Sequence, residues 1–177
     1  MIGDSKLDQD DVKVGIAQEL GRRLVDAGCR VITGGLGGVM AAAMEGARQS
    51  ATYSDGDTVA VLPGHDPADA ADSADIVIAT GLGLARNIIV ANADAVIAIG
   101  GGAGTLSEIA LAWQLRRPVV GIAVDGWSLK ASGTRIDHRQ RQPDIDNDRV
   151  FPAADAADAV RIILEVLPRY SKRMRYV

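Results

Sequence analysis

Five short, continuously apolar runs, each followed closely by glycine, constrain the fold of this chain most strongly. The runs span residues 31–33, 58–62, 76–79, 95–99 and 119–124. They do not alternate between apolar and polar residues, which is typical of strands that are buried on both faces of a parallel sheet. Glycine is expected where such a strand ends in a turn. The pattern therefore predicts buried parallel strands whose carboxyl ends are rich in glycine.

Helix-like stretches separate these runs. Residues 11–27 carry an apolar residue at every fourth position (Val12, Ile16, Leu20 and Leu24), which predicts an amphipathic helix. Further helices are predicted over 38–49, 105–116 and 153–167, and the small residues of 38–49 would let that helix pack close to a sheet. The alternation of strands and helices predicts a Rossmann-like α/β fold, with a doubly wound, mainly parallel sheet and helices on both faces.

The length of the chain bounds the number of domains. At 177 residues, it fits one domain by the usual range of about 100–200 residues. We expect a single domain over 1–177, with a polar surface excursion at 128–149 and a basic tail at 169–177. Only Met1 and Ile2 precede the first glycine, so the first strand is either very short or begins upstream. The start of the chain lacks the apolar core of a signal peptide, and no run approaches the ~20 residues of a membrane span.

Composition disfavours several classes of function. The net charge of −4 argues against a nucleic-acid partner, which usually requires a basic face. The two Trp, three Tyr and one Phe are dispersed, so no base-stacking platform is indicated. The single cysteine, Cys29, cannot form an internal disulfide and favours a reducing cytoplasm. The two histidines have no companion cysteines at zinc-site spacing, so no metal is expected.

The glycine clusters fall where open α/β sheets bind ligands, beyond the carboxyl ends of the strands. The richest cluster is 100–104, between a predicted strand and a predicted helix. Glycine amides can cradle an anion, and the helix adds partial positive charge, so a phosphate is the natural ligand. The Walker pattern is absent, and Thr105 stands where the dinucleotide fingerprint requires its last glycine. A P-loop NTPase and an ordinary NAD dehydrogenase are therefore both disfavoured.

Each of these features has a structural alternative. Thr105 and Glu108 have the spacing of a capping box, in which threonine caps the helix and glutamate bonds back to the cap. The four glycines within 34–38 could serve a flexible turn and close helix packing. Arg86, within a third glycine-containing cluster at 80–87, could bind phosphate or carboxylate through its guanidinium, or could be an ordinary surface or ion-paired arginine.

The order of several segments resembles the Lonely-Guy-like Rossmann superfamily, whose members were often mislabelled as lysine decarboxylases. The branch that the chain resembles most is the molybdenum-cofactor-carrier-like group, which is related to DNA-processing protein A. The resemblance covers roughly residues 14–124. It rests on the segments 33–40, 58–64, 80–87, 93–113 and 117–122.

The resemblance implies roles for particular residues. In the phosphoribohydrolase branch, a PGG-x-GT-x-x-E motif and an upstream Arg-Lys pair serve a nucleoside 5′-monophosphate. By position, Glu108 would be the motif glutamate and Arg86 the arginine, and both would be catalytic only in a hydrolase. Gly100 replaces the motif proline and Asn87 replaces the lysine. The carrier-like branch shares these departures, and it resembles a binder of a phosphate-bearing pterin cofactor.

The sequence and the resemblance together predict a carrier or binding protein for a phosphorylated ligand, either an AMP-like nucleotide or the molybdenum cofactor. The alternative is a hydrolase of the N-glycosidic bond of nucleoside 5′-monophosphates. A homodimer is expected, with no membrane partner. The candidate binding residues are Gly34, Gly35, Gly37, Arg86, Asn87, Gly101, Gly102, Gly104, Thr105 and Glu108, with Gly3 and Ser5 as further candidates.

Overall fold

The computed structural model describes residues 1–170, so most of the predicted basic tail lies outside the described residues. The strands are β1 (Ile2–Gly3), β2 (Val31–Thr33), β3 (Thr58–Leu62), β4 (Ile76–Ala79), β5 (Val96–Ile99), β6 (Val119–Ile122) and β7 (Val150–Ala153). The α-helices are α1 (Val12–Asp26), α2 (Val39–Arg48), α3 (Asn87–Ala91), α4 (Ala103–Gln114), α5 (Trp127–Ala131) and α6 (Ala156–Val166). Short 3₁₀ turns are η1 (Pro67–Asp69), η2 (Gly83–Arg86) and η3 (Leu167–Tyr170).

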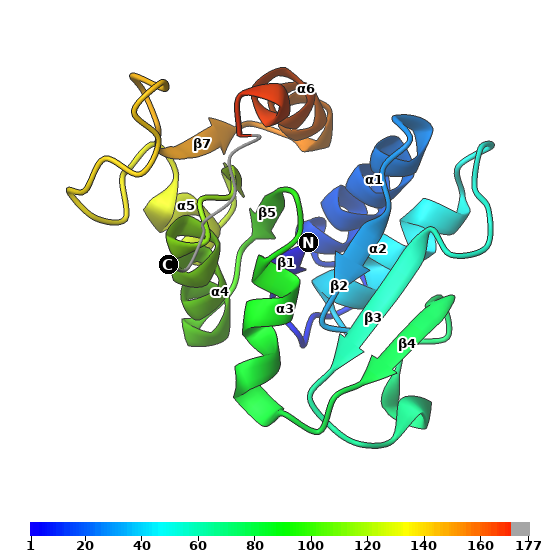
Figure 1. Cartoon of the computed structure of the whole chain (residues 1–177). Helices are drawn as coiled ribbons and strands as arrows, with labels where there is room; N and C mark the ends of the chain where they lie inside the picture. The colour runs from blue at the N-terminus through cyan, green and yellow to red at the C-terminus, as the bar shows by residue number, and fades with distance from the viewer. Residues whose placement is uncertain (171–177) are drawn as a thin grey trace.

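All strand pairs are parallel, and the strands form a four-stranded sheet in the order β1-β5-β6-β7 and a three-stranded sheet in the order β2-β3-β4. The nitrogen of Met1 donates to the carbonyl oxygen of Ile32 at 2.6 Å, which links β1 to β2. β1 thus lies between the two halves of the molecule (Figure 1). The predicted mainly parallel α/β fold is confirmed, and β1 comprises two residues.

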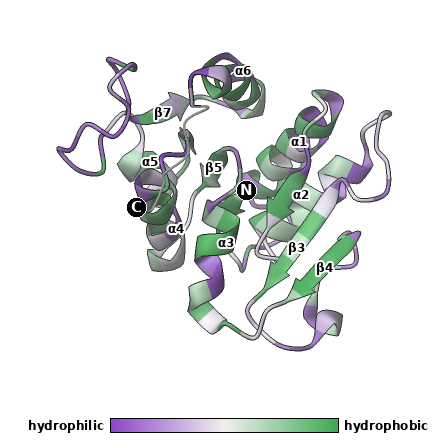
Figure 2. Ribbon diagram, viewed as in Figure 1, coloured by the Kyte–Doolittle hydropathy of each residue, from purple (hydrophilic) through white to green (hydrophobic). Residues whose placement is uncertain are grey.

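The helices cover the sheets in two groups. One hydrophobic cluster joins the strands to α1, α2 and α6, and the other joins them to α3, α4 and α5. The strands are the most apolar segments of the chain, whereas the loop between α5 and β7 is strongly hydrophilic (Figure 2). Within residues 1–170, no helix has the length and apolar character needed to cross a bilayer.

The stripe predicted for α1 is only partly buried. Leu20 and Leu24 lie in the core, but Val12 is 67% exposed. α1 packs on α2 through glycine: a Cβ at Gly21 or Gly46 would collide with the backbone of the facing helix. The small residues of α2 therefore serve a close contact with a helix as well as with the sheet.

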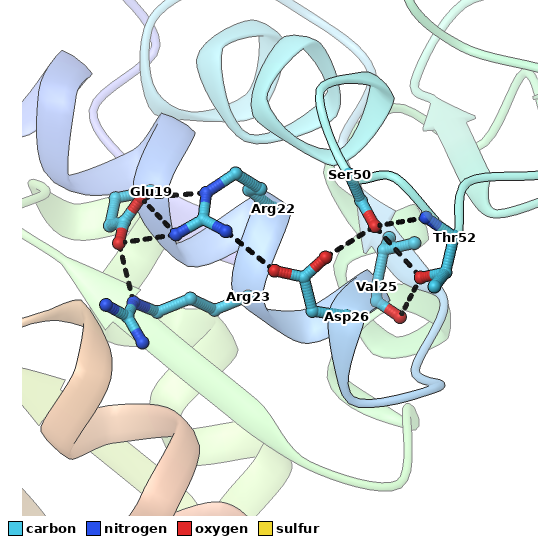
Figure 3. A network of polar contacts seen from close by, with 7 residues as sticks. All are labelled: Glu19, Arg22, Arg23, Val25, Asp26, Ser50 and Thr52. Carbon is cyan, nitrogen blue, oxygen red and sulfur yellow. Dashed lines mark hydrogen bonds and ion pairs between the residues drawn. The ribbon is translucent and has the colours of Figure 1, made fainter.

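The carboxyl end of α1 is tied to the turn after α2 by polar contacts (Figure 3). Arg22 donates to Glu19 at 2.8 Å and to Asp26 at 2.7 Å. The other oxygen of Asp26 accepts from the hydroxyl of Ser50 at 2.6 Å. Ser50 is buried, so this hydrogen bond fastens the carboxyl end of α1 to the turn that follows α2.

The expectation that 128–149 is a surface excursion is wrong in part. The segment begins within α5, and residues along it are buried, including Ser128, Ile145 and Asp148. The Arg141 guanidinium contacts both oxygens of Asp148 at 2.7 Å and donates to the carbonyl of Arg117 at 2.7 Å. A polar segment can be buried when its charges are paired and hydrogen-bonded, and periodicity does not reveal such pairing.

Candidate functional site

A hollow of about 440 Å³ opens at the carboxyl ends of β1 and β5. These two strands are neighbours, and the strand order runs in opposite directions on either side of them. That is the position at which doubly wound sheets bind ligands. The hollow is lined by Gly3, Asp4, Ser5, Lys6, Leu36, Met40, Leu84, Arg86, Asn87, Gly102, Gly104, Thr105 and Glu108.

The amino end of α4 faces this hollow. The first α-helical bond of α4 runs from the amide of Leu106 to the carbonyl of Gly102, so the amides of Ala103, Gly104 and Thr105 have no acceptor within the helix. No side chain among residues 1–170 caps the helix. A Cβ at Gly102 or Gly104 would meet nothing within 4 Å. Uncapped amides and the helix dipole together suit an anion.

The two glycines before this helix end are held by the protein itself. The amide of Gly101 donates to Asp4 Oδ2 at 3.0 Å, and the amide of Gly100 donates to the hydroxyl of Ser128 at 2.8 Å. Trp127 and Ser128 return hydrogen bonds to the carbonyls of the same two glycines. Gly100 and Gly101 therefore position the loop, and the amides free for a ligand begin beyond them.

Arg86 and Glu108 form an ion pair on the wall of the hollow. The distance from Arg86 Nη1 to Glu108 Oε1 is 3.4 Å, and the two side chains are 10% and 9% exposed. Burial raises the pKa of the Glu108 carboxyl, an effect that the charge of Arg86 opposes. Burial likewise lowers the pKa of Arg86. The guanidinium lies against Gly34, whose missing side chain makes room for it. Arg86 is therefore buried rather than exposed at the surface, and it forms an ion pair, as one of the alternative interpretations expected.

The capping box suggested by Thr105 and Glu108 is not formed. The cap position is Gly102, Thr105 lies inside the helix, and Glu108 pairs with Arg86. The helix begins two residues before the predicted start because Gly102 adopts the non-helical conformation of the cap. Both side chains are buried. Both residues line the hollow, and neither caps the helix.

The structure brings together six of the ten candidate residues and both further candidates, Gly3 and Ser5. The six that line the hollow are Arg86, Asn87, Gly102, Gly104, Thr105 and Glu108. Gly34, Gly35 and Gly37 do not line it; they allow close packing behind it against Arg86, Leu62 and Ser5 respectively. Asn87 is held by its own bond to the hydroxyl of Ser107 at 3.0 Å.

Sequence reasoning missed five residues of the hollow. They are Asp4, Lys6, Leu36, Met40 and Leu84. Asp4 and Lys6 follow β1 directly, so charged residues just beyond a strand end were the available signal. Leu36 and Met40 lie close in the sequence to the glycines that the pattern predicted as binding residues. Within residues 1–170, no three His, Cys, Asp or Glu side chains gather as metal ligands would.

A larger groove, of about 1000 Å³, runs along α1 and the ends of α2 and α6. Its charged lining residues are Asp10, Asp11, Glu19, Arg23, Glu45 and Asp155. Carboxylates dominate this set, so the groove would repel a phosphate. The smaller hollow, with its uncapped helix end and Arg86, is the better candidate for an anionic ligand.

The fold and the position of the hollow define a Rossmann-like α/β protein with its candidate site at the strand-order switch. The chain belongs to the SLOG cluster4 family, whose profile matches residues 1–156. The resemblance inferred from the sequence is thereby confirmed.

The chain is similar to the solved structures of two molybdenum cofactor proteins. It is 30% identical to the molybdenum cofactor binding protein of Rippkaea orientalis, with a TM-score of 0.74 over 93% of each chain. It is 33% identical to the molybdenum cofactor carrier protein of Chlamydomonas reinhardtii, with a TM-score of 0.73 over 94% of this chain and 96% of that one.

The chain is also similar to a protein of Archaeoglobus fulgidus and to a DNA processing protein A. A protein of Archaeoglobus fulgidus is 42% identical over 128 residues, which are 68% of this chain and 80% of the relative. The single-stranded-DNA-binding protein DNA processing protein A of Helicobacter pylori is 17% identical, with a TM-score of 0.61 over 93% of this chain and 78% of that one. At that identity the likeness concerns the fold alone.

Proposed function

We propose that this protein binds and carries a small phosphorylated ligand, a nucleotide or a pterin-type cofactor such as the molybdenum cofactor. The observation that carries the proposal is the uncapped amino end of α4, which opens into the hollow between β1 and β5. The volume of about 440 Å³ falls in the range of small-ligand sites. The similarity to two molybdenum cofactor proteins supports a carrier role.

The phosphate would accept hydrogen bonds from the amides of Ala103, Gly104 and Thr105. These donors lie on a rigid helix, so they need no rearrangement to receive the anion. Arg86 adds positive charge on the same wall, although Glu108 offsets part of it. Leu36, Met40 and Leu84 supply apolar surface for the rest of the ligand.

A second function, hydrolysis of nucleoside 5′-monophosphates, is favoured by the buried Arg86–Glu108 pair. A carboxyl group that lines a hollow and whose pKa is raised by burial is a candidate general acid or base. Glu108 would assist water in attacking the ribose carbon as the base leaves, and Arg86 would stabilise the developing charge. The missing motif proline and lysine, at Gly100 and Asn87, weigh against this function.

One experiment separates the two functions. The protein is titrated with AMP, GMP and a pterin phosphate by calorimetry, and the nucleotide mixtures are examined for free base by chromatography. We expect saturable binding with no release of base. Release that is lost in Glu108→Gln would establish the hydrolase, because glutamine keeps the shape but cannot exchange the proton. Absence of binding to any nucleoside monophosphate or pterin phosphate would contradict both functions.

We further propose that the protein is a homodimer that pairs through η2 and α3. Four apolar side chains are exposed there: Leu82 (52%), Leu84 (85%), Ile88 (44%) and Ile89 (40%). Exposed apolar groups that gather on one segment are typical of an interface. Leu84 also lines the hollow, so the interface would lie beside the ligand.

Light scattering after size-exclusion chromatography tests the dimer. The wild-type protein should have twice the mass of one chain, and Ile88→Asp should have the mass of one chain. Leu164→Asp is the matched control, because Leu164 on α6 is 45% exposed and Ile88 is 44% exposed. This control should remain dimeric. A monomeric wild-type protein, or equal effects of the two substitutions, would contradict the proposed interface.

No nucleic-acid partner forms part of the proposal. The net charge of −4 disfavours contact with a phosphate backbone. The proposed compartment is the cytoplasm, since a chain with one cysteine, Cys29, gains nothing from an oxidising environment.

A further inference from the structure

Asp4 places a carboxylate beside the proposed phosphate position. It follows β1, lines the hollow and is 27% exposed at its side chain. Its Oδ2 accepts from the amide of Gly101 at 3.0 Å and from Lys13 Nζ at 2.8 Å. Gly101 directly precedes Gly102, the cap of α4. An anion at the helix end would therefore lie close to a second negative charge.

The two oxygens of this carboxylate have different surroundings. Within residues 1–170, both hydrogen bonds of the Asp4 side chain end on Oδ2. Oδ1 accepts no hydrogen bond from the described residues, and it belongs to a side chain that lines the hollow. Lys13, which does not line the hollow, neutralises part of the charge and holds the carboxylate in place. Oδ1 is therefore a fixed hydrogen-bond acceptor. A hydroxyl or N–H group can donate to it, whereas an anion without a donor cannot.

We propose that Asp4 determines the specificity of the site, and that it selects phosphate esters carrying a hydroxyl or N–H donor near the phosphate. A ligand with such a donor forms a hydrogen bond to Oδ1, so its interaction with the carboxylate becomes favourable. A phosphate ester without a donor meets only repulsion there. This inference rests on the proposed phosphate site and names the class of ligand that it prefers.

The substitution Asp4→Asn tests this role with little change of shape. The asparagine oxygen can take the place of Oδ2, accepting from Gly101 and Lys13. The side-chain NH₂ then replaces Oδ1, so that a donor stands where the acceptor was. The probes are AMP, which has ribose hydroxyls and an amino group, and phenyl phosphate, which has the same charged group and no donor.

The measured quantity is the preference for AMP, given by the ratio of the two dissociation constants from calorimetric titration. In the wild-type protein the ratio should favour AMP. In Asp4→Asn it should fall about tenfold or more, the usual effect of losing a hydrogen bond to a charged group, while phenyl phosphate binds equally well or more tightly. Thermal melting checks the fold, and Asp4→Ser, which also removes the carboxylate, provides a second variant.

Asp11→Asn is the matched control. Asp11 accepts from the backbone amide of Lys13 at 2.9 Å as the cap of α1, and it does not line the hollow. Asparagine is an equally good cap, so the charge changes while the site does not. An unchanged ratio in Asp4→Asn, or an equal change in Asp11→Asn, would overturn the role of Asp4 alone. A wild-type protein that binds neither probe would overturn the phosphate site itself.

Discussion

Replacing Gly102 by valine should abolish binding of phosphorylated ligands while leaving the protein folded. Gly102 is exposed at the cap of α4, and a Cβ there meets no atom within 4 Å. Its φ of −98° lies outside the left-handed region that favours glycine. The valine side chain would stand in the space through which a phosphate approaches the amides of Ala103, Gly104 and Thr105.

The size of the effect follows from the bonds that are lost. Hydrogen bonds to charged groups contribute about 1.5–3 kcal/mol each. Loss of two of them would weaken binding by about 3–6 kcal/mol, which is roughly 100-fold or more. Calorimetric titration with AMP or a pterin phosphate measures this loss, and thermal melting establishes that the variant is folded.

Gly15→Val provides the control for this substitution. Gly15 lies on the exposed side of α1, a Cβ there would also meet nothing within 4 Å, and the residue is absent from the lining of the hollow. This variant should bind as the wild-type protein does. Wild-type affinity in Gly102→Val would show that the amino end of α4 does not receive the ligand.

The largest loss of stability is expected from Arg141→Met. The Arg141 side chain is 6% exposed and that of Asp148 is 7% exposed. The guanidinium also donates to the carbonyls of Trp113 and Arg117, and it lies 3.6 Å from the Trp113 ring centroid. Among the residues that the structure describes, methionine would leave Asp148 buried with only the Tyr170 hydroxyl as a side-chain partner. Such a loss costs about 3–5 kcal/mol.

Thermal or urea unfolding measures this cost, which corresponds to a fall in Tm of roughly 6–20 °C for a chain of this size. Arg161→Met is the matched control. Arg161 also contacts two carboxylates, those of Asp158 and Glu165, but it is 63% exposed. Exposed pairs contribute about 0–1 kcal/mol. Similar losses in the two variants would contradict the assignment of Arg141 as a buried anchor of the segment 132–149.

The double substitution Arg141→Met with Asp148→Asn refines this result. It removes the unpaired charge that the single substitution creates, so part of the lost stability should return. If nothing is recovered, the cost arises from the hydrogen bonds of Arg141 to the backbone rather than from its ion pair.

Local pattern was sufficient to predict most of the fold. The run 58–62 is β3 with the same bounds, because a continuous apolar segment is stable only when both of its faces are covered. Gly102 and Gly104 were predicted as site residues because they follow a buried strand, and they prove to be the cap and the first turn of α4. Arg86 and Glu108 were placed in the site through the resemblance, and the structure brings them to 3.4 Å.

Other features depend on residues that are distant in the sequence. The bond from Gly101 to Asp4 joins positions 97 residues apart, and the bond from Arg141 to Trp113 spans 28. No local pattern records such pairs. The capping-box spacing of Thr105 and Glu108 pointed to the wrong partner, because Glu108 pairs with a buried arginine from η2 and not with the helix cap.

The sequence by itself determined where the strands lie and where glycine follows them, but the prediction that all five runs are buried is wrong for β4, an edge strand whose Ile76 and Ile78 are exposed. These properties depend on hydrophobicity and on backbone sterics, which act within a few residues. Only the tertiary structure decided which charged groups are buried and with which partners, as for Asp4, Arg86 and Arg141. The cost of burying a charge is offset only by groups brought close in space, and the folded chain brings them from distant positions.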